Sequence, residues 1–148
     1  MKTNKAVQVS FVLLMVAMII GLIYGLVVTF STELLVSRSF PLYTGQSWTD
    51  LKMSDPVLAN YIIIALRFAG GGALGLSFAA IMVLFNAYRK VEKWSWYVML
   101  GSSTIAWGIT LIGNITYNNP VTIAICVVGL SLNAIALIIS AKAFLVDK

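Results

Sequence analysis

Long apolar runs separated by short polar segments set the overall pattern of the chain. Four runs, at about 6–30, 58–88, 94–116 and 121–141, each hold the roughly 20 mostly apolar residues that a helix needs to cross a bilayer. This pattern predicts an all-α membrane protein, a bundle of four transmembrane helices in one domain over residues 1–148. The first run is about twice as long as the apolar part of a signal peptide, so we expect a retained helix.

The charges between the apolar runs predict how the helices are oriented. Basic residues lie before the first run, between the second and third, and after the fourth: Lys2, Lys5, Arg89, Lys90, Lys93, Lys142 and Lys148. Because cytoplasmic loops carry an excess of lysine and arginine, both termini are expected inside the cell. This N-in/C-in topology places segment 31–57 outside, and we expect a multi-pass protein of a prokaryotic plasma membrane.

Aromatic residues near the ends of the runs are typical of the two membrane interfaces. The inner belt is expected to comprise Tyr88, Trp94, Trp96 and Tyr97, and the outer belt Phe40, Tyr43, Trp48, Tyr61 and Tyr117. The outer segment 31–57 is itself rich in apolar residues, so we expect it to lie on the membrane or on a partner. Within it, Ser47–Met53 predicts a short interfacial helix, and Asp55 with Pro56 predicts the start of the second spanning helix.

Composition excludes several classes of function. The chain is 60% hydrophobic and 10% charged, and its net charge of +5 includes no basic cluster, so no nucleic-acid partner is expected. With no histidine and one cysteine, Cys126, it lacks the side chains for histidine-ligated haem or zinc, a histidine-assisted nucleophile or a Cys-x-x-Cys redox pair. We predict no catalytic, metal-binding or cofactor-binding residue, and we do not expect an enzyme, although an enzyme complex could include this chain.

Two pairs of glycines have the spacing of helix-packing motifs. Gly21 and Gly25 lie four residues apart in the first run, and Gly71 and Gly75 lie four apart in the second. Small residues at this spacing let two helix backbones approach closely inside a membrane. We expect both pairs to pack within the chain; the alternative is that one of them docks another subunit.

Arg67 is the one charged residue well inside a predicted span, and such a residue is a candidate functional site. Helical spacing places it on one face with Asn60, Gly71 and Gly75, and a span centred near position 73 places it about 9 Å from the midplane on the outer side. We expect it to reach outward and pair with Glu33, or else with one of two aspartates, Asp50 and Asp55. The alternatives are an anion, lipid or substrate site, or an ion pair with a partner subunit.

Residues in the last two runs form two rows that we expect to bond or pack between helices: Ser103, Trp107, Thr110 and Asn114 in the third run, and Cys126, Gly129, Asn133 and Ser140 in the fourth. Asn133 is the most costly of them to leave unpaired in a membrane, so it should hydrogen-bond to a neighbouring helix. The alternative is that these rows line a small polar pocket or pore.

Three short motifs resemble those of small prokaryotic four-helix membrane proteins of the DoxX-like kind. The motifs are Gly45-x-x-Trp48-x-x-Leu51, Asp55-Pro56-x-Leu58-Ala59-x-Tyr61 and Tyr88-Arg89-Lys90-x-Glu92-Lys93-Trp94-x-Trp96, and they cover about the middle third of the chain. The resemblance implies a four-helix architecture and carries no catalytic residue. Some proteins of this kind are accessory subunits of oxidoreductase complexes.

The leading functional hypothesis is a non-catalytic accessory or structural subunit of a larger membrane protein complex. It rests on the missing catalytic side chains, the glycine pairs and the apolar outer segment. The alternative is a small transporter, channel or lipid-handling protein that uses Arg67 on a polar helix face. The expected partners are membrane lipids together with other membrane subunits or further copies of the chain.

Overall fold

The computed structural model describes residues 4–116 and 118–146. In chain order they form α1 (Lys5–Phe30), α2 (Thr32–Thr44), α3 (Trp48–Ser54), α4 (Pro56–Asn86), the 3₁₀ turn η1 (Tyr88–Lys90), α5 (Lys93–Val98), the π-helical turn η2 (Met99–Ser103), α6 (Thr104–Thr116) and α7 (Pro120–Leu145). No strand occurs among these residues. Four stretches are long and apolar enough to cross a membrane, which confirms the predicted all-helical class and the number of candidate spans: α1, α4 with η1, α5 through α6, and α7.

Polar side chains cap the starts of α3 and α4. The Asp55 carboxylate accepts a hydrogen bond of 2.9 Å from the Leu58 backbone N–H, and Pro56 occupies the first helical position, as predicted. The Ser47 hydroxyl accepts one from the Thr49 N–H at the start of α3, so the predicted short helix forms one residue later than expected. Local capping signals therefore fix these boundaries.

α2 is a helix that the sequence pattern did not predict. It follows α1 after a single non-helical residue, Ser31, and it contains Pro41, which usually marks a helix end. α2 stops at Gly45, whose φ of 72° lies in the left-handed region that glycine adopts without strain. Segment 31–57 is therefore folded into two helices rather than extended along a surface.

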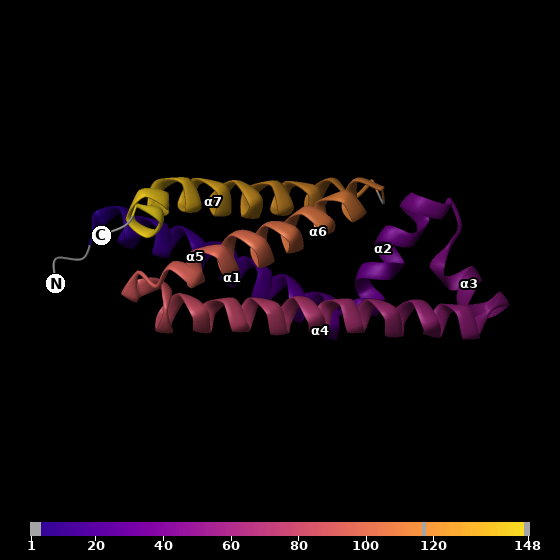
Figure 1. Ribbon diagram of the computed structural model, residues 1–148. Coiled ribbons are helices and arrows are strands. Elements are labelled where there is room, and N and C mark those ends of the chain that lie inside the picture. Colours follow the sequence, from indigo (N-terminus) through magenta and orange to yellow (C-terminus); the bar gives the residue numbers. More distant parts are fainter. Residues whose placement is uncertain (1–3, 117, 147–148) are drawn as a thin grey trace.

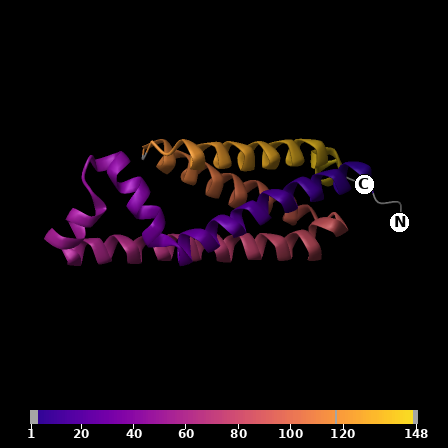
Figure 2. The same cartoon turned by 180° about the vertical axis from the view of Figure 1, so that it is seen from behind.

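The four long stretches form an incomplete bundle. α1 packs along both α4 and α7, and α6 packs on α7, whereas α4 and α6 scarcely touch. Figures 1 and 2 show α1 running diagonally, close to α7 at one end and close to α4 at the end where α2 begins. We call the end that contains the start of α1, η1 and the end of α7 the closed end.

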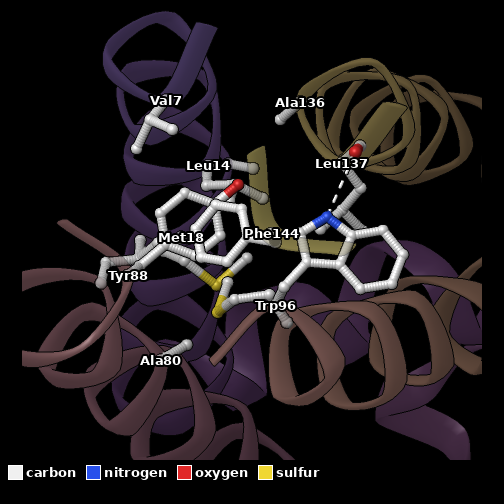
Figure 3. Close-up of a cluster of buried hydrophobic side chains, with 12 residues drawn as sticks. Val7, Leu14, Met18, Ala80, Tyr88, Trp96, Ala136, Leu137 and Phe144 are labelled. Carbon is white, nitrogen blue, oxygen red and sulfur yellow. Dashed lines mark hydrogen bonds between the residues drawn. The ribbon is translucent and has the colours of Figure 1, made fainter. Parts of the chain in front are cut away.

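The main core lies at the closed end (Figure 3). Tyr88 and Met99 are fully buried there, Trp96 is buried against α7, and their neighbours are Val7, Leu14, Met18, Ala80, Leu84, Ala136, Leu137 and Phe144. The Trp96 indole N–H donates a hydrogen bond of 3.2 Å to the Leu137 carbonyl oxygen. Tyr88 and Trp96 were expected in an inner interfacial belt, and that prediction is wrong because both rings fill the core.

A smaller core lies beyond the other end of α1. Gly70 of α4 packs against Val28 and Thr29 in the last turns of α1, so residues 56–69 extend past α1 by roughly 20 Å at 1.5 Å per residue. α2 and α3 cover one face of this extension, with Trp48 buried between them. We call α2, α3 and residues 56–69 the lobe; Figure 1 shows it at the end opposite the closed end.

Candidate functional site

A groove runs between α4 and α6, with α1 as its floor. Small side chains dominate its lining: Gly21, Ala73, Ser77, Ser103, Ala106 and Thr110. None of the lining residues is a carboxylate, a lysine or an arginine. The groove is partly open and has a volume of about 50 Å³, whereas sites for small molecules usually have about 300–1,000 Å³. The groove is therefore an open gap between helices and is too small to be a binding cavity for a solute.

The π-helical turn η2 forms part of the groove wall. It carries Ser103, whose hydroxyl hydrogen-bonds to the Asn133 side-chain oxygen at 2.6 Å, and the Asn133 amide donates to the Thr104 hydroxyl at 3.0 Å. Asn133 is buried, and these two bonds satisfy both ends of its amide between α7 and the third stretch. The predicted hydrogen bond across helices is confirmed, whereas Asn133 lines neither a pore nor the groove.

Trp107 closes the groove on the side of α7. A β-carbon placed on Gly129 would lie 2.6 Å from the indole ring, and one placed on Gly21 would lie 3.7 Å from it. The ring therefore fits against two glycines on two different helices. Sequence reasoning placed Trp107 in a polar row and did not predict this contact.

The two glycine pairs have different surroundings. A β-carbon on Gly25 would lie 2.7 Å from the Leu74 backbone nitrogen, and one on Gly21 would lie 2.7 Å from the Ser77 hydroxyl, so this pair packs within the chain as expected. Gly71 and Gly75 have no atom within 4 Å of an added β-carbon. The expectation that they pack within the chain is wrong, because α1 contacts α4 through Gly70 instead. Docking of another subunit stays a prediction for this pair.

Arg67 does not lie on a packing face. Its side chain is exposed, it forms no ion pair with any residue the structure describes, and it lies level with the end of α1. The expected pairing with Glu33, or else with Asp50 or Asp55, is therefore wrong for the described residues. The expected depth of Arg67 in the membrane stays a prediction. Asn60 is exposed on the lobe as well, distant along α4 from the groove.

Glu33 pairs with Lys52 instead. The Lys52 ammonium lies 2.7 Å from the Glu33 carboxylate and joins the start of α2 to α3. The hydrogen bond and the positive charge of Lys52 hold the pKa of Glu33 below its usual value of 4.5, and the more distant charge of Arg67 adds to this effect. Both side chains are exposed, so the pair serves the lobe and forms no buried site.

A buried chain of hydroxyl groups at the closed end was missed from the sequence. The Tyr88 hydroxyl donates to the Ser140 hydroxyl at 2.7 Å and is also hydrogen-bonded to the Ser10 hydroxyl. Ser140 in turn donates to the Ala136 carbonyl oxygen at 2.9 Å. A lone serine near the same end of each of two apolar runs was the available signal. The chain ends on a backbone carbonyl and includes no carboxylate, lysine or arginine, so it provides cohesion rather than a path for protons.

Metal ligands and reactive cysteines are further candidate groups for a functional site in the described residues. No group of three or more cysteine, aspartate or glutamate side chains that could hold a metal occurs within 4–116 and 118–146. Cys126 is a buried free thiol in α7. Comparisons with known protein families, with curated proteins and with solved structures find no match for this chain.

Proposed function

We propose that the chain is a multi-pass integral membrane protein with both termini in the cytoplasm, and that it acts as a non-catalytic accessory subunit. In this role it holds a transmembrane helix of a partner protein in the groove between α4 and α6. The proposal rests on one observation. The two helices lie next to each other in the bundle, yet they make few direct contacts and are separated by a groove lined mainly by small, uncharged residues. Small residues are what a close helix contact in lipid requires.

The distribution of buried residues supports this role. In the most apolar window of each spanning stretch, 28% of residues are buried for α1 and for α7, but 22% for α4 and 17% for the third stretch. The two helices that form the groove walls thus have the smallest buried fractions of the four stretches. A partner helix bound between them would increase the buried fraction of both.

The size and chemistry of the groove favour a helix over a transported solute. Binding sites for small molecules usually enclose about 300–1,000 Å³, far above the 50 Å³ found here. Arg67, the residue on which the transporter alternative rests, lies level with the end of α1 and does not line the groove. The wall hydroxyls donate within their own helices, as Thr110 does to the Ala106 carbonyl oxygen at 2.8 Å, and the hydroxyl oxygen can still accept a hydrogen bond from a partner helix.

Filling the groove tests the proposal. Ala106→Leu and Ala73→Leu add bulk to opposite walls, and Ala134→Leu makes the same change on an exposed position of α7 as the matched control. Tagged chains are isolated from native membranes in mild detergent, and the intact particles are weighed by mass spectrometry. We expect a stoichiometric partner with the wild type and the control, and its loss with both groove variants. A wild-type particle that contains no other protein contradicts the proposal, as does a partner that both groove variants retain.

A further inference from the structure

The face of α4 that points away from α1 and from the groove has the spacing of a coiled-coil seam. In the lobe, four large residues on this face are exposed: Val57, Tyr61, Ile64 and Phe68. Beyond the lobe the same face continues with four more exposed positions: Gly71, Gly75, Phe78 and Met82. The steps between successive positions alternate strictly between four and three residues. This is the repeat of a helix that winds around another helix, and we call these eight positions the α4 seam.

The two parts of the seam differ in side-chain size: the lobe part has large exposed apolar residues, and the part beside α1 begins with two glycines. The lobe part extends past the end of α1, yet Val57 is 79% exposed, Phe68 78% and Tyr61 68%. A continuous row of large apolar side chains that no other element of the chain covers is a candidate interaction surface. The part beside α1 instead has two glycines with open space around them, which would let a second helix approach closely. A second helix along the whole seam accounts for both parts.

We propose that the α4 seam binds the α4 seam of a second copy of this chain, forming a parallel two-fold dimer whose axis runs along the membrane normal. All copies of the chain have the same orientation in the membrane, so two α4 helices meet in parallel and in register, each seam residue beside its own counterpart. The seam contains no charged residue over its whole length, so identical helices meet without like charges in contact. This surface is separate from the groove and does not require it.

The residues beside the seam fit the same partner. Arg67 lies immediately before the seam position Phe68, on one flank of the seam. In a parallel pair of helices, a residue on this flank faces the opposite flank of the partner helix, at the position five residues further along the sequence. The residue there is Gly72, and the neighbouring positions on that flank are Ala65 and Ala79. The guanidinium therefore lies over a glycine of the second copy, with room to bond to its backbone, and not beside another cation.

The exposed area of the seam is comparable to what a dimer needs. Taking about 200 Å² for a large side chain that is fully exposed, the exposed fractions of the six large seam residues correspond to roughly 700 Å² per copy. This is the most that these side chains could bury, and a standard stable interface buries about 800 Å² per partner.

Disulfide crosslinking in native membranes tests the dimer. Single cysteines are placed on a Cys126→Ser background at seam positions Ile64, Gly71 and Gly75 and at two exposed off-seam controls, Ala69 of α4 and Ala134 of α7. We expect oxidation to give a covalent species at twice the 16.1 kDa of the chain in at least tenfold higher yield at the seam than at the controls. Equal yields at both sets, or no dimer at any seam position, overturn the proposal.

A photo-crosslinker at Gly75 identifies the occupant by mass. An adduct of two copies of this chain supports the proposal, whereas an adduct with any other protein overturns it. Ala106→Leu fills the groove and should leave the seam crosslinks unchanged. Failure of the dimer and failure of the accessory role are therefore separate outcomes.

Discussion

The closed end and the lobe are held together in different ways. At the closed end, aromatic rings are buried together with hydroxyl groups, and the polar atoms of Tyr88 and Trp96 have partners on other helices. In the lobe, Trp48 is equally buried but its indole nitrogen has no partner, the one such buried side-chain nitrogen or oxygen found in the described parts of the chain. An unmade hydrogen bond of this kind costs about 1–3 kcal/mol. The closed end is therefore the better satisfied part of the fold, and the lobe contains a buried polar atom whose hydrogen bond is not made within the described chain.

The largest effect is expected from removing the ring at the centre of the closed end. Tyr88→Ala deletes a fully buried ring and leaves the Ser10 and Ser140 hydroxyls without their shared partner. We expect a loss of about 3–5 kcal/mol in the free energy of unfolding, measured by thermal unfolding in detergent. Tyr97→Ala, at a half-exposed ring nearby, is the control and should change stability little. Equal losses of unfolding free energy in the two variants would show that the buried ring stabilises the fold no more than an exposed one does.

The next effect contrasts the two glycine pairs. Gly25→Val forces side-chain atoms into the Leu74 backbone, which cannot move aside cheaply, while Gly75→Val extends into open space. We expect Gly25→Val to cost about 1–3 kcal/mol or more through overpacking, and Gly75→Val to leave the unfolding of the isolated chain unchanged. The measurement is the midpoint of thermal unfolding in a detergent that disperses the chain to monomers. A destabilised Gly75→Val monomer would contradict the open surroundings of that glycine.

A smaller effect is expected at the middle of the bundle. Asn133→Ala removes the partner of Ser103 and Thr104 and should cost about 1–2 kcal/mol. A double-mutant cycle with Ser103→Ala isolates the pair, because residues that share a hydrogen bond are not additive. Strict additivity of the two substitutions would show that the bond contributes nothing to stability.

The smallest effect concerns pH and is confined to the lobe. Lys52 lowers the pKa of Glu33 in the folded lobe, so near that pKa the folded state binds fewer protons than the unfolded chain. The contribution of the pair is therefore complete above about pH 4.5 and is lost as the pH falls through the lowered pKa. Hydrogen exchange of the α2 and α3 amides should show a difference between the wild type and Lys52→Met near neutral pH. That difference should vanish in acid, and one that persists there would have another cause.

The long elements could be predicted from the sequence because one physical quantity decides them. A run of about 20 apolar residues has few stable alternatives to a spanning helix, and a local cap such as Asp55 with Pro56 acts within one turn. α2 was missed because its apolar positions follow no clear period and Pro41 lies inside it. Its helix is stabilised by the lobe core around Trp48, a contact that only the folded chain makes.

The candidate site was harder to predict because it depends on which faces of the helices meet. The run Gly70-Gly71-Gly72 offers small residues in several directions, and the sequence does not say that α1 contacts Gly70 while Gly71 stays open. Tyr88 and Trp96 have the composition of interfacial aromatics, and only the partners Ser140 and Leu137 on α7 distinguish a buried ring from an interfacial one. Neither distinction is visible in the order of the residues alone.

The π-helical turn in the third span has a consequence for helical phase. In a regular α-helix, Trp96 and Trp107 would lie within about 20° of each other, since eleven residues complete almost exactly three turns. The wider turn at Met99–Ser103 takes up one extra residue, which rotates the part after it by roughly 100° relative to the part before it. On both sides of this turn the third stretch contacts α7, where Trp96 donates to the Leu137 carbonyl oxygen and Trp107 packs against Gly129, while Trp107 also reaches Gly21 of α1. The third stretch therefore consists of two helical segments of different phase, and a substitution series along it needs a separate helical wheel for each segment.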